Sequence, residues 1–186
     1  MTRELTVLGL SGSLRQGSYN TAALNAAVDL APAGMRLVTA SIRDVPLYDE
    51  DVKAAGIPPA VVRLQAAVAA ADAVLIVSPE YNYSVPGVLK NALDWLSRTS
   101  PMPFARKPVA ILGASPGLLG TARAQYHLRQ VLQSLNAHVL NRPEVMIANA
   151  AAKFDATGAL IDAPTCEHLG KLLVALGEWT RTLHPG

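Results

Sequence analysis

The chain has one cysteine, few aromatic residues and no long block of charge of either sign. Its one cysteine, Cys166, excludes an intramolecular disulfide framework and a dithiol redox pair. Sixteen basic and fourteen acidic side chains give a net charge of +2 without a basic tract, which argues against a nucleic-acid partner or an anionic membrane. No apolar run approaches the roughly 20 residues of a membrane span. We therefore expect a protein that binds neither nucleic acid nor membranes.

Length and composition predict a single domain over residues 1–186. Apolar residues make up 51% of the 186 residues and charged residues only 16%, so most elements should be covered on both sides. The first apolar run, Leu5–Leu10, is shorter than the core of a secretion signal. The expected location is the cytoplasm.

Two common nucleotide-binding motifs and a metal-binding pattern are also missing. The G-x-G-x-x-G spacing of dinucleotide folds is absent, and no lysine lies between Gly9 and Asn20 to complete a triphosphate-binding loop. His127 and His138 have no partner at metal-ligand spacing, so no metal site is expected.

Short apolar runs alternate with helical patterns along the chain. Strands are predicted at Leu5–Leu10, Arg36–Ala40, Ala73–Val77 and Val109–Ala114, with a weaker fifth around Ala137–Val139 and a further candidate at Val145–Ile147. Helices are predicted at Asn20–Ala31, Pro59–Ala70, Pro86–Ser97, Thr121–Leu135 and Thr165–Leu183, the last capped by Thr165.

This alternation predicts an α/β fold with parallel strands and right-handed crossovers. Five strands in a chain of this length favour the flavodoxin-like, doubly wound sheet of order 2-1-3-4-5, with helices on both faces. In such a sheet, ligands bind beyond the carboxyl ends of the strands, where the winding direction reverses between the first and third strands.

Unusual polar segments follow three of the predicted strands, at Gly12–Asn20, Ser78–Gly87 and Gly113–Thr121. The first precedes a helix and offers Ser13, Arg15, Ser18 and Asn20 as hydrogen-bond donors, which suits one terminal monophosphate such as that of FMN. An ordinary Ser/Gly turn is the competing interpretation.

The other two segments suit the flat ring of a flavin. Backbone groups and Asn82 are able to hydrogen-bond its amide edge, while Tyr81 or Tyr83 flanks it. The third segment is rich in small residues, which allows close backbone approach to a flat ligand.

The motifs Gly12-Ser-Leu-Arg-x-x-Ser-x-Asn20, Pro79-Glu-Tyr-Asn-Tyr-Ser-Val-Pro86 and Ser115-Pro-Gly117 resemble those of the NADPH-dependent FMN reductase family, in its branch of quinone and chromate reductases. The resemblance covers nearly the whole chain. It implies FMN contacts after the first strand from Ser13, Leu14, Arg15, Gln16, Gly17, Ser18, Tyr19 and Asn20, after the third from Pro79, Glu80, Tyr81, Asn82 and Tyr83, and after the fourth from Ser115 and Gly117. Thr121 departs from the family pattern, which has a glycine there in many relatives.

Several of these side chains have competing interpretations. Arg15 contacts the flavin phosphate, meets the phosphates of the nicotinamide donor, or points into solvent. Glu80 is expected to supply backbone contacts and cap a turn rather than to transfer protons. Trp95 belongs either to the core or to a subunit contact, beside an i, i+4 pair of Lys90 and Asp94.

The resemblance also implies a homo-oligomer, dimer or tetramer, whose sites are completed by a neighbouring subunit. Arg123, Gln125, Tyr126 and Glu144 then form a polar network across the contact, or else ordinary solvated faces. The acidic segment Asp44–Asp51 either reaches the partner or is a solvated connection.

Together these patterns predict an FMN-dependent oxidoreductase that transfers electrons from NADPH or NADH to a quinone, with chromate or other oxidants as further acceptors. Because the chemistry takes place on the flavin, no catalytic acid–base pair is expected. The alternatives are a flavodoxin-like electron carrier without NAD(P)H chemistry, an FMN-binding sensor module and an azo-compound reductase. The balance of charge argues against the carrier, since carriers tend to have acidic docking faces.

Overall fold

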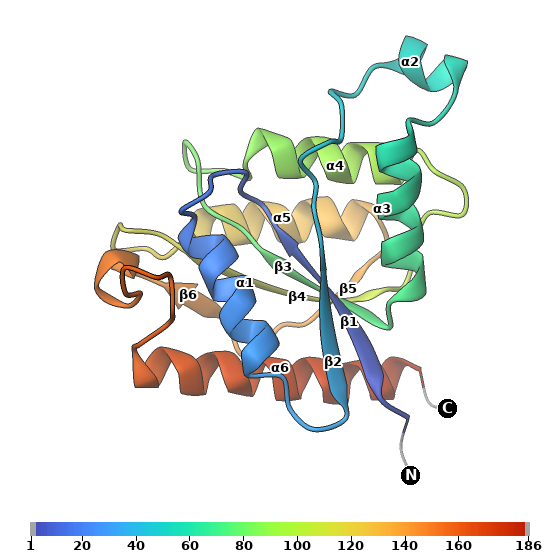
Figure 1. Ribbon diagram of the computed structural model, residues 1–186. Coiled ribbons are helices and arrows are strands. Elements are labelled where there is room, and N and C mark those ends of the chain that lie inside the picture. The colour runs from blue at the N-terminus through green and yellow to red at the C-terminus, as the bar shows by residue number, and fades with distance from the viewer. Residues whose placement is uncertain (1–2, 185–186) are drawn as a thin grey trace.

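The computed structural model of the chain describes residues 3–184 and contains a parallel sheet with helices packed on both faces (Figure 1). The strands are β1 (Leu5–Ser11), β2 (Met35–Ala40), β3 (Ala73–Val77), β4 (Pro108–Ala114), β5 (His138–Val139) and β6 (Val145–Ile147). The helices are α1 (Tyr19–Asp29), α2 (Glu50–Ala55), α3 (Pro59–Ala70), α4 (Gly87–Ser97), α5 (Ala122–Ser134) and α6 (Ala163–Leu183), with a short 3₁₀ turn, η1 (Ala150–Ala152).

The strand order β2-β1-β3-β4-β5 confirms the predicted flavodoxin-like topology. All pairs are parallel, with Gly9 opposite Thr39 on β2 and Leu75 on β3. The weak fifth strand is only two residues long, and the candidate run at 145–147 forms β6, which pairs with the carboxyl half of β4. The sheet therefore has a sixth strand that extends the edge beside the end of β4.

The sheet separates two apolar cores. One lies under α1 and α6, and the other lies under α3, α4 and α5. Every residue of β3 and of β4 is buried, as the continuous apolar runs predict for strands covered on both faces. Because backbone groups buried on both faces must pair within the sheet, the central strands are rigid and fix where their carboxyl ends lie.

The last helix begins earlier than its pattern predicts. Asp162, not Thr165, is its N-cap: the Asp162 carboxylate accepts a hydrogen bond from the Thr165 backbone N–H at 3.0 Å. Pro164 then lies inside the first turn, where its missing N–H costs nothing. The assignment of Thr165 as the cap was therefore wrong by one turn.

The acidic segment 44–51 is tied to α4 and continues into α2, a helix that the sequence pattern did not predict. Asn91 accepts from the Tyr48 N–H at 2.8 Å and donates to the Pro46 carbonyl at 2.8 Å. Trp95 donates to the same carbonyl at 2.9 Å and is fully buried, which places it in the core. In Figure 1, α2 projects from the body at the top right.

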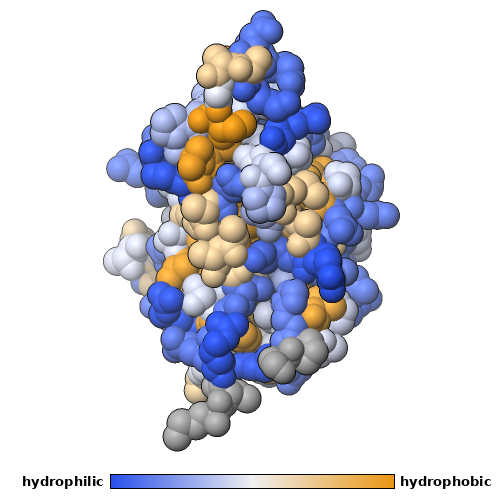
Figure 2. Space-filling model, turned by 90° about the vertical axis from the view of Figure 1, so that its right-hand side faces the viewer, coloured by the Kyte–Doolittle hydropathy of each residue, from blue (hydrophilic) through white to orange (hydrophobic). Residues whose placement is uncertain are grey.

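Surface polarity is mixed on the face shown in Figure 2, where hydrophobic patches lie between hydrophilic ones. Among residues 3–184, no helix is both long and apolar enough to cross a bilayer.

Gly113 in β4 is the glycine of the sheet with the least space for a Cβ atom. A Cβ atom there would lie 2.1 Å from Thr121 Oγ1 and 2.3 Å from the Ser78 carbonyl oxygen, and the carbonyl belongs to the backbone of the neighbouring loop. We expect Gly113→Ala to lower the free energy of unfolding by about 1–3 kcal/mol, the cost of overpacking, as measured by urea denaturation.

Gly170 is the matched control, because it lies within α6 and a Cβ atom there meets nothing within 4 Å. Gly170→Ala should raise stability by about 0.5–1 kcal/mol through helix propensity. A Gly113→Ala protein as stable as the parent would show that the loop after β3 adjusts freely.

Candidate flavin site

Three loops meet at the carboxyl edge of the sheet, as the topology predicts. We call them L1 (residues 12–20, after β1), L3 (residues 78–87, after β3) and L4 (residues 113–121, after β4). One cavity of about 440 Å³ is lined by all three, and we call it the L1–L3–L4 cavity. Its lining residues are Ser13, Arg15, Ser18, Tyr19, Asn20, Pro79, Glu80, Tyr81, Ala114, Ser115 and Pro116.

L1 wraps around the N-terminus of α1. Ser18 is the N-cap, and its hydroxyl accepts from the Asn20 N–H at 3.2 Å. Ser13 is buried and accepts from the Arg15 N–H at 3.3 Å, which curls the loop back on itself. The first turn of α1 contains no acidic residue, so the helix dipole and the loop donors together favour an anion here.

Asn20 joins L1 to L4. Its side-chain nitrogen donates to the Ala114 carbonyl at 2.9 Å, and its side-chain oxygen accepts from the Ala114 N–H at 2.8 Å. The side chain is buried, and a buried amide that exchanges two hydrogen bonds with one backbone unit holds both partners firmly. Asn20 thus lines the cavity and also holds L1 against L4, a role that the sequence did not reveal, and its contact with FMN stays a prediction.

The tip of L3 is a tight two-residue turn. Asn82 and Tyr83 both have positive φ, at 49° and 65°, and Tyr81 and Ser84 exchange backbone hydrogen bonds of 3.1 and 3.0 Å across them. This is the turn geometry that closes β-hairpins. The turn places Tyr81 on the cavity wall, whereas Asn82 and Tyr83 form an exposed tip beside it.

Glu80 of L3 holds the start of α5. Its carboxylate accepts from Arg123 Nε at 2.6 Å and from the Ala124 N–H at 3.1 Å. The Arg123 guanidinium also lies over the ring of Tyr83, with its central carbon 3.6 Å from the ring centroid. Arg123 therefore fixes L3 against α5 within one chain.

Burial would raise the pKa of Glu80, but the hydrogen bonds from Arg123 and Ala124 outweigh it, so that the pKa lies below its ordinary value. Glu80 is consequently ionised at neutral pH and has no proton to donate. Through the Ala124 N–H the carboxylate caps the first turn of α5, while its place beside a bound flavin stays a prediction.

L4 is shaped by its own backbone contacts. Ser115 accepts from the Gly117 N–H at 3.0 Å through its hydroxyl, and its backbone pairs with Ile147 at the end of β6 and with Ala150 beyond it. Thr121 is buried with φ of 77°, a left-handed conformation that favours glycine, and its hydroxyl accepts from Gln125 Nε2 at 3.1 Å.

Gln125 is consequently a core residue rather than part of a surface network. It is 1% exposed and donates to Thr121 and to the Val145 carbonyl. Glu144 pairs with Arg142 at 3.4 Å and with Arg129 at 4.0 Å. Of the four residues suggested for a subunit network, Tyr126 is the one that is more than half exposed.

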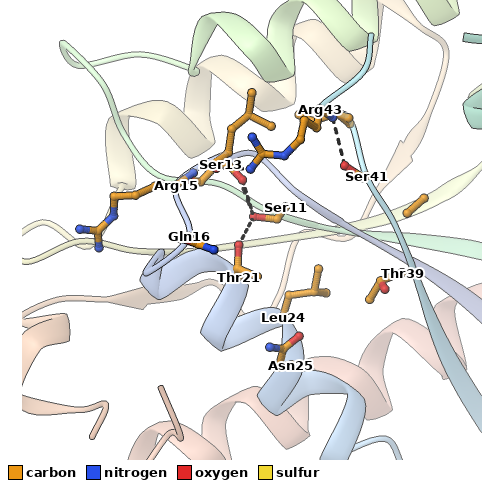
Figure 3. Close-up of a pocket in the computed structure, with 13 residues that line it drawn as sticks. Ser11, Ser13, Arg15, Gln16, Thr21, Leu24, Asn25, Thr39, Ser41 and Arg43 are labelled. Atoms are coloured by element: carbon orange, nitrogen blue, oxygen red, sulfur yellow. Dashed lines mark hydrogen bonds between the residues drawn. The ribbon is translucent and has the colours of Figure 1, made fainter. Parts of the chain in front are cut away.

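Six of the fifteen predicted residues do not line the L1–L3–L4 cavity: Asn82 and Tyr83 at the exposed tip of L3, Gly117 farther along L4, and three residues of L1. Leu14 and Gln16 line a second cavity beside β2, shown in Figure 3, and Gly17 lines a third beside the segment 155–158. The sequence pattern did not predict the other residues that line the second and third cavities. The strand order contained a signal for the second cavity, because β2 pairs with β1 and its carboxyl end must lie next to L1.

The ionised state of Glu80 has a measurable consequence for stability. Its lowered pKa means that the native state gains stability from the carboxylate above its ordinary pKa of 4.5 and loses it as the pH falls through the lower native value. At pH 7, Glu80→Gln should lower the free energy of unfolding by about 1.5–3 kcal/mol, the range for hydrogen bonds to a charged group.

The difference between the Glu80→Gln protein and the parent should shrink on acidification below pH 4.5, as followed by urea unfolding at several pH values. Glu178→Gln, at an exposed position on α6, is the control and should change little at any pH. A difference that stays constant down to pH 3 would contradict the ionic role of Glu80.

Comparison with known proteins places the chain in a family. Residues 5–152 match the NADPH-dependent FMN reductase family. The chain is 56% identical to an NAD(P)H-dependent FMN reductase of Pseudomonas aeruginosa, over 98% of this chain and 99% of that protein. It is 49% identical to a quinone reductase of Escherichia coli, over 96% and 97% of the two chains.

The solved structure of FerB, a flavoenzyme NAD(P)H:(acceptor) oxidoreductase from Paracoccus denitrificans, superposes with a TM-score of 0.87 at 34% identity and covers 96% of this chain and 98% of its own. A family match over most of the chain and relatives of nearly equal length agree with the motifs of L1, L3 and L4. The protein belongs to the NADPH-dependent FMN reductase family of oxidoreductases.

Proposed function

We propose that the protein, as a single FMN-binding domain, transfers electrons from NADPH or NADH through FMN to quinones. The observation that carries this proposal is the meeting of L1, L3 and L4 at one cavity, with the N-terminus of α1 at one end and an exposed tyrosine at the other. The names of its relatives, an FMN reductase and a quinone reductase, support the donor and the acceptor.

L1 would hold the FMN phosphate. Ser13 and Ser18 are buried hydroxyls at the helix N-terminus, and Arg15 supplies the positive charge. The dipole of α1 adds about 0.3–1 kcal/mol for an anion at this position. Leu14, Gln16, Gly17, Tyr19 and Asn20 complete the segment, with Asn20 acting mainly by holding L1 against L4.

L3 and L4 would hold the ring. Pro79, Glu80 and Tyr81 form one wall, and Ser115 with Pro116 forms the other, while Asn82 and Tyr83 stand at the rim and Gly117 lies farther along L4. When bound, FMN supplies the hydride and electron chemistry, and the protein binds and orients the ring. Because Glu80 is paired with Arg123, we assign it to positioning L3 rather than to proton transfer.

The exposed rim has a consequence for acceptors. Tyr81 is 50% exposed and Tyr83 is 66% exposed, so the ring face would be reached directly from solvent. A broad acceptor range follows, with chromate and other oxidants beside quinones. Azo-compound reduction would differ in the acceptor and not in the site. Since the donor belongs to cellular metabolism, we also propose a cytoplasmic location.

We further propose a homo-oligomer, a dimer or tetramer. Apolar side chains at the rim support it: Leu118 is 82% exposed and Leu119 is 52% exposed on L4, and Tyr126 is 51% exposed on α5. Large apolar side chains gathered next to a binding site are typical of interaction surfaces. A second subunit would cover these side chains.

An anaerobic reduction experiment tests the enzyme activity. The purified protein is loaded with FMN, and NADPH or NADH is added while the flavin absorbance is followed; free FMN with the same donor is the control. We expect rapid bleaching by at least one donor, and reoxidation in one step upon addition of a benzoquinone. Failure of both donors would remove the reductase proposal and favour the electron carrier.

A rim substitution tests the oligomer. Leu118→Asp should shift the protein to a smaller species in size-exclusion chromatography, because a charge cannot be buried without a partner. Val174→Asp, at a residue on α6 that is 48% exposed, is the matched control and should elute as the parent does. If Leu118→Asp elutes unchanged, the L4 surface is not the subunit contact.

A further inference from the structure

A second cavity lies at the carboxyl end of β2, on the other side of L1 from the L1–L3–L4 cavity (Figure 3). We call it the β2 cavity. Its volume is about 450 Å³, within the usual range for small-molecule sites. It is lined by Ser11, Ser13, Leu14, Arg15, Gln16, Thr21, Leu24, Asn25, Thr39, Ala40, Ser41, Ile42 and Arg43.

The lining of the β2 cavity suits an anion that also carries hydroxyl groups. It presents the hydroxyls of five serine and threonine residues together with the guanidinium of Arg43, and no carboxylate is among the described residues that line it. Ser11 and Thr21 already share a hydrogen bond of 2.9 Å at its floor, whereas Thr39 and Ser41 are exposed on the β2 side. Leu24 and Ile42 supply apolar surface for a flat group.

The two arginines of this cavity have different roles. Arg43, in the turn that follows β2, extends toward L1, where its Nη2 donates to the Leu14 carbonyl, so a hydrogen bond holds the exposed guanidinium at the cavity. A guanidinium has five N–H donors, and this contact uses one of its two Nη atoms. Arg15 turns its guanidinium away from β2 and donates to the Gly17 carbonyl, on the phosphate side of L1.

The position of Arg43 in the fold points to a ligand. In dinucleotide-binding folds an arginine near the end of the second strand accommodates the 2′-phosphate of the ligand. L1 lacks the G-x-G-x-x-G spacing of those folds, so the comparison here covers only the place of the arginine after the second strand. In this protein Ser41 and Arg43 follow β2 directly. The β2 cavity and the L1–L3–L4 cavity share Ser13 and Arg15, so they adjoin across L1.

We propose that the β2 cavity binds the 2′-phosphoadenosine end of NADPH, with Arg43 as the residue that contacts the 2′-phosphate and Ser41 beside it. This inference rests on the proposed function, since it assigns the remote end of the donor whose nicotinamide would lie over the flavin. Contact between Arg43 and the 2′-phosphate would make the protein selective for NADPH, because NADH lacks this phosphate.

Substitution of Arg43 in the FMN-loaded protein tests the proposal. Arg43→Ala should raise the KM for NADPH about tenfold, the loss expected for a hydrogen-bonded charge, while kcat and the KM for NADH stay the same. Arg43→Lys should recover part of the loss. Arg36→Ala is the matched control, because Arg36 is an exposed arginine within β2 whose guanidinium bonds Thr6 outside the cavity.

Direct binding supplies a readout that does not depend on turnover. In calorimetric titrations of the FMN-loaded protein, adenosine 2′,5′-bisphosphate should bind at least tenfold more tightly than adenosine 5′-monophosphate or inorganic phosphate, and Arg43→Ala should remove the difference. Equal binding of the bisphosphate and inorganic phosphate would reduce the cavity to a general anion site and overturn the proposal.

Two other outcomes would also overturn it. If Arg43→Ala raises the KM for both donors equally, or weakens FMN binding, Arg43 acts only by supporting Leu14 in L1. If NADPH bleaches the flavin of the parent protein and Arg43→Ala behaves identically, the proposed function stands and this assignment alone fails. Absence of bleaching in the parent would instead refute the proposed function itself.

Discussion

Parallel pairing of β1, β3 and β4 is the constraint on which the site depends. Because these strands run in the same direction and are buried on both faces, the loops that follow them must leave at one edge of the sheet. Asn20 then closes the arrangement, since its two hydrogen bonds to Ala114 hold L1 against the end of β4. Three segments that are far apart in the sequence thereby become the walls of one cavity.

Three arginines lie around the carboxyl edge of the sheet, and each makes different contacts. Arg123 is committed to Glu80 and to the ring of Tyr83, which keeps L3 attached to α5. Arg15 lies on the phosphate side of L1, and Arg43 lies across the β2 cavity. The three side chains of like charge thus point in different directions, and Arg123 neutralises Glu80, the carboxylate among the described residues that line the L1–L3–L4 cavity.

Much of the fold was predictable because its signals are local. Continuous apolar runs predicted β3 and β4, and helical spacing predicted α6. The errors arose where tertiary contacts decide. Asp162 rather than Thr165 caps α6, and α2 forms in a segment that Asn91 and Trp95 hold against α4. Gln125 is polar and lies at the start of a helix, a pattern typical of a surface residue, although its Nε2 donates to Thr121 and to the Val145 carbonyl in the core.

The sequence by itself determined the strand order, the three loops and the family, because apolar periodicity and turn-rich motifs depend only on residues that are close together in the sequence. Only the tertiary structure decided which loop residues face one another. Leu14 and Gln16 turn toward the β2 cavity, whereas Ser13 and Arg15 border both cavities. The physical reason is that a side chain's direction in a loop follows from hydrogen bonds to distant backbone, such as those of Asn20 to Ala114, and no local pattern encodes them.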